Sequence, residues 1–107
     1  MDWKPIARAE FEVILQEEFA KLPAEELKLY ETYATALLEQ PCYRSEQYGI
    51  ERVFVVARAG RRLLLFDDVD DEFAIGIPDS DGVLRNWSLY GTLAVAVRNL
   101  PTEALSP

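Results

Sequence analysis

Residues 52–68, RVFVVARAGRRLLLFDD, decide the fold. Segment 52–59 is rich in β-branched and aromatic residues and is apolar on both faces, which is typical of a central strand. Gly60 then occupies the first central position of a two-residue turn, which favours a tight hairpin. Segment 62–68 reads as the return strand. Together they predict an antiparallel sheet.

The chain after this hairpin predicts more strands and then a helix. Residues 72–78 alternate between apolar and polar side chains, as a half-buried strand does. DSDG at 79–82 is a turn signal, and 83–87 fits a short fourth strand. Ser88 is a suitable cap for a final helix that runs to residue 100. The apolar stripe of this helix comprises Leu89, Leu93, Val97 and Leu100.

The chain before the hairpin has the periodicity of helices. Apolar residues recur every three or four positions over 6–22 and again over 23–40, and Pro23 separates the two segments. This tight junction predicts an antiparallel helical hairpin. Residues 41–51 read as a connector. We therefore expect one α+β domain, residues 1–107, built as a two-layer sandwich: an N-terminal helical hairpin on one face of a three- or four-stranded antiparallel meander, then a C-terminal helix.

Charge limits the classes of partner. The chain of 107 residues has 19 acidic and 11 basic residues and no histidine, for a formal net charge of −8. Such a chain repels nucleic-acid phosphates and acidic membranes, so it favours basic proteins or cations. Cys42 is the only cysteine, which excludes an internal disulfide. No signal peptide or membrane-spanning run is evident, and we expect a cytoplasmic protein.

Five acids lie in six positions between two apolar segments: Asp67, Asp68, Asp70, Asp71 and Glu72. A calcium loop is not supported, because Ile77 occupies the first-ligand position before DSDG and no glutamate follows at the required distance. Paired catalytic carboxylates need a cleft, and a small domain with one thin sheet offers little room for one. The chain also lacks histidine and any nucleophile motif. We expect no metal, no cofactor and no enzyme activity.

The same acids suit a binding surface for a basic protein. Clustered negative charge repels itself but attracts Arg and Lys and speeds association. Tyr48 and Trp87 are candidate aromatic anchors beside it, with Tyr43 and Tyr90 as further candidates. The alternative is that these aromatics are core and the acids a solvated turn. If the acids form a docking site, replacing Asp67, Asp68, Asp70 and Asp71 together by Asn should leave folding unchanged or slightly improved, because self-repulsion is relieved.

Residues 51–100 also resemble small acidic immunity proteins of bacterial polymorphic-toxin systems. A hairpin of the type VFVVAR-x-G leads into an acidic turn, DDV-x-x-x-F, and then into a strand, a D-G turn and an aromatic residue before the last helix. The resemblance implies that the protein neutralises a cognate toxin by binding it, the acids 67–72 occluding a basic active site. Rival expectations are a bacterial adaptor, an oligomer subunit or a divalent-cation-dependent enzyme. The oligomeric state is left open.

Overall fold

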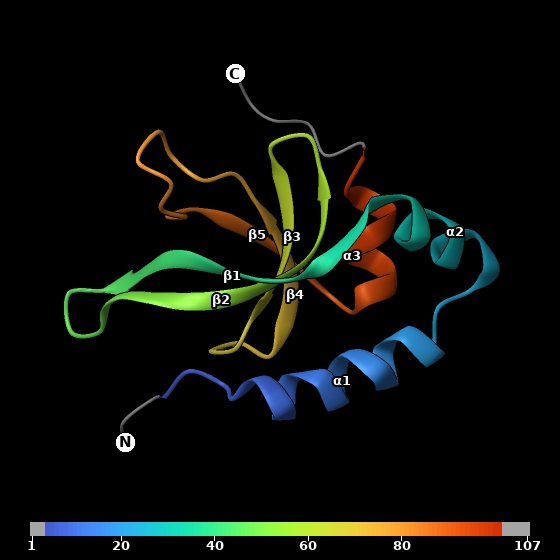
Figure 1. The fold of residues 1–107 in the computed structure, drawn as a ribbon, viewed down its shortest axis with the longest axis horizontal. Helices are drawn as coiled ribbons and strands as arrows, with labels where there is room; N and C mark the ends of the chain where they lie inside the picture. Colours follow the sequence, from blue (N-terminus) through green and yellow to red (C-terminus); the bar gives the residue numbers. More distant parts are fainter. Residues whose placement is uncertain (1–3, 102–107) are drawn as a thin grey trace.

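The computed structural model describes residues 4–101 and has an α+β fold with a five-stranded antiparallel sheet in the order β1-β2-β3-β4-β5 (Figure 1). Two helices precede the strands and one follows them. The elements are α1 (Arg8–Ala20), α2 (Ala24–Tyr33), β1 (Ala34–Ser45), β2 (Gly49–Ala59), β3 (Arg62–Asp67), β4 (Glu72–Gly76), β5 (Trp87–Gly91) and α3 (Leu93–Asn99).

The central hairpin is confirmed. Strand β2 pairs with β3 on one side and with β1 on the other, and its residues Val53–Ala57 are all buried. Gly60 and Arg61 form the two-residue turn, with Gly60 at φ +63°. This left-handed conformation explains glycine at the first turn position, since other residues adopt it at a cost.

All three helices cover one face of the sheet. Phe11 of α1 is fully buried and stacks on Phe54 of β2 at 5.2 Å between ring centroids. It also contacts Phe66 of β3 at 5.1 Å. Helix α3 adds Leu93, Ala96 and Val97 to this core, and Leu100, which follows the helix, adds a fourth side chain. Aromatic pairs of this kind contribute roughly 0.5–1.5 kcal/mol beyond the burial of their area.

The opposite face of the sheet has a second core, because the segment between β4 and β5 folds back over it. Leu84 is fully buried there with Cys42, Val53, Val55 and Leu65. The Leu84 N–H donates to the Pro41 carbonyl at 2.9 Å, and the Tyr43 N–H donates to the Leu84 carbonyl at 2.9 Å. The chain therefore makes a parallel bridge from β1 to residue 84 and partly closes the sheet.

The predicted helix over 23–40 is wrong in its second half. Helix α2 ends at Tyr33, and Ala34–Gln40 belong to β1. The segment ATALLEQ has good helix formers, so its propensity misled the prediction. Strand β2, apolar on both faces, needs a neighbour on each side, and β1 pairs with it. The antiparallel helical hairpin is not confirmed.

Two further boundaries differ from the prediction. The connector over 41–51 is the end of β1, a short turn and the start of β2. The fourth strand at 83–87 and a helix from Ser88 are also wrong, because 87–91 is strand β5, a fifth strand, and α3 begins at Leu93. The side chain of Thr92, not Ser88, caps α3 by accepting from the Val95 N–H at 3.3 Å.

Candidate functional site

The acidic segment is the turn that joins β3 to β4, as predicted. Its first acid, Asp67, organises the turn: Oδ1 accepts from the N–H groups of Val69 at 3.0 Å and Asp70 at 3.2 Å. Asp71 follows with φ +55°, a left-handed conformation that Asp tolerates better than most residues. The turn is thus held by its own side chain, because Asp67 caps its backbone donors.

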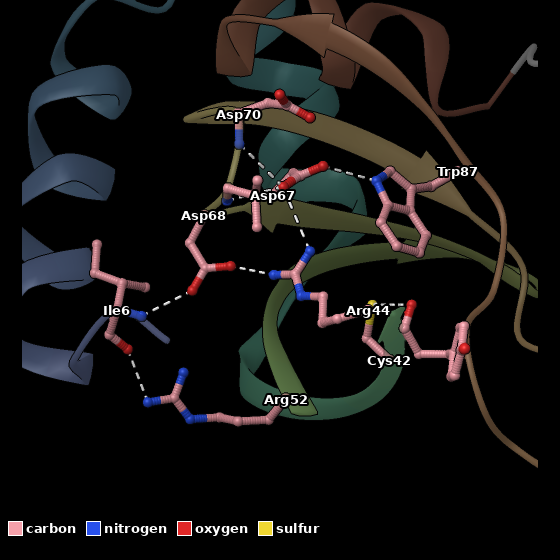
Figure 2. Close-up of polar contacts among 10 residues, drawn as sticks. Ile6, Cys42, Arg44, Arg52, Asp67, Asp68, Asp70 and Trp87 are labelled. Carbon is pink, nitrogen blue, oxygen red and sulfur yellow. Dashed lines mark hydrogen bonds and ion pairs between the residues drawn. The ribbon is translucent and has the colours of Figure 1, made fainter. Parts of the chain in front are cut away.

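A buried ion-pair network fixes the base of this turn (Figure 2). Arg44 reaches across from β1, and its guanidinium lies 3.4 Å from Asp67 Oδ1 and in contact with Asp68. The indole N–H of Trp87 donates to Asp67 Oδ2 at 2.8 Å. The side chains of Arg44, Asp67 and Asp68 are 5%, 3% and 3% exposed. Buried charges of this kind are tolerated only when they are paired and hydrogen-bonded.

The second carboxylate also holds the segment that precedes α1. Asp68 Oδ2 accepts from the Ile6 N–H at 2.7 Å, and the Ile6 carbonyl accepts from Arg52 at 2.7 Å. The Arg52 guanidinium lies 4.3 Å from the centre of the Phe54 ring. The backbone of Ile6 is therefore held at both its N–H and its carbonyl, which connects the entry of α1 to the acidic turn (Figure 2).

The pKa values of the two buried acids are shifted in opposite directions. Burial alone would raise the pKa of Asp67, but hydrogen bonds from Trp87, Val69 and Asp70, with the charge of Arg44, lower it. For Asp68, burial outweighs the Ile6 N–H and the Arg44 charge, so its pKa is raised above the ordinary value. The difference follows from the number of donors that each carboxylate receives.

Of the five acids predicted as partner-binding residues, two have buried side chains. Asp67 and Asp68 are internal, and their oxygens are occupied by donors from the same chain. Asp70 and Asp71 are exposed, and Glu72 is half-buried at the start of β4. The expectation that Asn at all four aspartates leaves folding unchanged considered only repulsion among the acids, and it does not apply to Asp67 and Asp68, which are paired with Arg44.

Both predicted aromatic residues, Tyr48 and Trp87, lie with two of the acids on one side of the turn. A cavity of about 330 Å³ is lined by Tyr48, Trp87, Asp67 and Asp70, together with Arg44, Ser45 and Val69. Four of the seven predicted site residues thus meet in one hollow. Trp87 is half-buried rather than fully core, and Val69 is 54% exposed at its rim. Asp71 is not part of this hollow.

A second hollow lies on the other side of the turn. It has a volume of about 430 Å³, and α1, the β3–β4 pair and the β5–α3 junction form its walls. Its lining residues are Ile14, Glu17, Glu18, Lys21, Phe66, Asp71, Phe73, Gly91 and Thr92. The β3–β4 turn is therefore a ridge that carries exposed carboxylates between two hollows.

Sequence reasoning missed Arg44, which is the cation paired with the two buried acids. Its only available signal was a lone base in a connector near two tyrosines. The DSDG segment is a turn, as predicted, because the Gly82 N–H donates to the Asp79 carbonyl at 2.9 Å. Its carboxylates are bound by Arg85, at 2.9 Å from Asp79 and 2.8 Å from Asp81.

Over residues 4–101, no group of three or more acidic or cysteine side chains is arranged to hold a metal ion. Nor does the described chain contain a helix with the length and apolar character needed to span a bilayer. Cys42 is fully buried, and burial raises the pKa of its thiol to about 11, so this cysteine is a poor nucleophile.

Comparison with protein-family models, with curated protein sequences and with solved structures finds no significant match. The resemblance to immunity proteins thus has no independent support, and the site geometry is the basis for assigning a role.

Proposed function

We propose that this protein is a non-catalytic binding domain for a basic protein, which docks on the ridge formed by the β3–β4 turn. The observation that carries the proposal is that the turn has one pair of buried acids and one pair of exposed acids. Asp67 and Asp68 are buried and bound to Arg44, whereas Asp70 and Asp71 face solvent. The buried pair fixes the backbone that presents the exposed pair.

Rigid presentation matters for binding because ordering a flexible loop costs free energy. A turn already held by Asp67 loses little conformational entropy when a partner arrives. The exposed acids, in a chain with a net charge of −8, would steer a basic partner and raise the rate of association. Exposed Val69 and half-buried Trp87 offer the apolar contacts that interfaces place among charges.

The resemblance suggests the kind of partner. A bacterial immunity protein, acting in the cytoplasm, would cover the basic active site of a cognate toxin with this ridge. An immediately upstream gene for a large toxin in the source genome would favour this version of the proposal. Detection of a reproducible hydrolase or nuclease activity that one carboxylate substitution abolishes would contradict it.

The decisive experiment is to capture the partner from the source organism, identify it by mass spectrometry and measure binding kinetics at low and high salt. We expect Asp70→Asn with Asp71→Asn to slow association markedly and to flatten its salt dependence, since steering is lost. Glu25→Gln with Glu31→Gln removes the same charge from exposed positions of α2 and is the matched control. Equal kinetics in the two double variants would reject the ridge as the docking site.

A homo-oligomer is the rival proposal, and a separate feature favours it. Tyr43 and Ile50 are opposite each other in the β1–β2 pair and are 38% and 55% exposed. The hairpin that carries them projects from the sheet, away from α2 and α3 (Figure 1). A self-associating chain would gain mass with concentration in analytical ultracentrifugation, and Ile50→Ser would suppress this gain.

A further inference from the structure

The hollow between α1 and the β3–β4 turn is a candidate for a specific contact within the proposed interface. Its floor contains Phe66 and Phe73, and Ile14 adds a third apolar side chain. Its volume of about 430 Å³ is in the range of small ligand sites. An apolar floor with a few polar groups at the rim is the usual composition of a pocket that takes one side chain.

The rim of this hollow has more negative than positive charge. Glu18 is already occupied: one of its oxygens accepts from the Leu93 N–H at 3.1 Å, and the other lies 3.3 Å from the Lys21 ammonium. Glu17 and Asp71 differ from it. Within residues 4–101, the carboxylate of neither residue takes part in a hydrogen bond or an ion pair. Two carboxylates on separate walls therefore have acceptor capacity directed at solvent.

We infer that this hollow receives an arginine side chain of the basic partner. This inference rests on the proposed function and adds the residue type and its location. The apolar floor would cover the aliphatic stem of the arginine, and the guanidinium would bridge Glu17 of α1 and Asp71 of the turn. Guanidinium presents five donors in a planar fork and can serve two carboxylates at once, whereas the ammonium of lysine is a compact point charge.

The hollow of about 330 Å³ that is lined by Trp87 fits an arginine side chain less well. It is lined by Arg44, which is already paired with the Asp67 carboxylate of the same hollow. The oxygens of Asp67 in that hollow already accept from Arg44, Trp87 and two backbone N–H groups. Within residues 4–101, Asp70 is then the one carboxylate of that hollow without a partner, whereas the α1 hollow has two, Glu17 and Asp71.

A titration with a one-arginine peptide tests this inference without a partner in hand. Acetyl-Gly-Arg-Gly-amide is added to isotopically labelled protein, and amide and carboxyl NMR shifts are followed. We expect saturable shifts at Asp71, Gly91 and Thr92 and at the Glu17 carboxyl, with the Trp87 indole N–H unmoved. The matching lysine peptide should bind more weakly, and the neutral citrulline peptide should not bind.

Two isosteric variants complete the test. Glu17→Gln and Asp71→Asn should each weaken binding about ten-fold, the usual loss for one charge-assisted contact. Both residues are exposed, and Asn also adopts the left-handed conformation at position 71, so folding should be retained. Glu25→Gln with Glu31→Gln is again the control and should bind like the wild type.

Failure of this inference can be told apart from failure of the proposed function. An absence of saturable shifts, equal binding of all three peptides, or shifts centred on Trp87 would overturn the arginine site. In that case the partner kinetics of the Asp70→Asn, Asp71→Asn variant still test the ridge. Conversely, arginine binding in the hollow, combined with a partner whose kinetics are unchanged in the Asp70→Asn, Asp71→Asn variant, would reject both the ridge and the use of this hollow by that partner.

Discussion

The guanidinium of Arg44 lies between two buried carboxylates and beside an indole ring, at 5.8 Å from the ring centre. No other base in residues 4–101 forms an ion pair with Asp67 or Asp68. Two acids against one base leave this group negative, and the donors from Trp87, Ile6 and the turn backbone compensate for the difference. The stability of the turn therefore depends on one side chain from a distant strand.

Removal of Arg44 should be costly. We expect Arg44→Met to lower the free energy of unfolding by about 3–5 kcal/mol, because two buried carboxylates lose their cation. Urea denaturation measures this loss. Combining it with Asp67→Asn and Asp68→Asn should restore part of the stability, since the uncompensated charge is gone. Arg85→Met, which breaks two exposed ion pairs, is the control and should have a much smaller effect.

Asp67 and Asp68 predict a specific dependence on pH. The pKa of Asp67 is lower in the folded state than its ordinary value of 3.8, so this acid stabilises the fold above that pH. Its contribution is lost as the pH falls through the lower, folded-state pKa. The pKa of Asp68 is raised, so its ionisation reduces stability as the pH rises through the window above 3.8.

Urea denaturation between about pH 5 and pH 2 can separate these two contributions. Asp67→Asn should be less stable than the wild type at neutral pH and should lose less stability on acidification. Asp68→Asn should change the pH dependence of the free energy of unfolding in the opposite sense, because it removes the carboxylate whose ionisation reduces stability. If the free energy of unfolding depends on pH identically in the wild type and both variants, the assigned directions of the two pKa shifts are wrong.

Helix α3 shows how a single element depends on contacts outside its own sequence. It is short, Leu93–Asn99, and both of its ends are bound by other parts of the chain. At its start, Glu18 of α1 accepts from the Leu93 N–H, and Thr92 caps Val95. At its end, Arg62 of β3 donates to the Leu100 and Pro101 carbonyls at 2.7 and 3.1 Å. A helix this short is stable only through such contacts.

The position of the cap can be tested with two matched substitutions. Thr92→Ala should destabilise the protein by about 1 kcal/mol, the usual cost of losing an N-cap. Ser88→Ala should be nearly neutral, because Ser88 is exposed on β5 and caps nothing. Thermal or urea unfolding measures both. A larger loss for Ser88→Ala would restore the helix start that the sequence suggested.

The whole molecule has two apolar layers, one on each face of a curled sheet. The helices cover one face, and the segment 77–86 covers the other by joining β1 through residue 84 (Figure 1). Gly76 is needed at the bend, since a Cβ there would meet the Asn86 carbonyl oxygen at 2.8 Å. This closure also brings Trp87 to Asp67, so the curl of the sheet assembles the site.

A substitution of Leu84 tests how much the core on the face opposite the helices contributes to stability. Leu84→Ala should lower the free energy of unfolding by about 2–5 kcal/mol, because this side chain is fully buried. Leu89→Ala makes the same change at a side chain that is 44% exposed and should cost clearly less. Urea denaturation with intrinsic fluorescence measures both losses. Similar values for the two variants would mean that residues 77–86 form only a surface loop.

Local patterns in the chain were sufficient to predict the α+β class, the antiparallel β2–β3 hairpin with its glycine turn, and the acidic connection to β4. These features depend on local periodicity and turn chemistry, which act between neighbouring residues. Tertiary pairing makes Ala34–Gln40 a strand, since β2 required a partner there and pairing outweighed helix propensity. It also divided the acids into a buried pair and an exposed pair. That division depends on Arg44 and Trp87, which lie 23 and 20 residues away from Asp67 in the chain. Pairing of charges at such separations is set by the closure of the sheet, which no local pattern encodes.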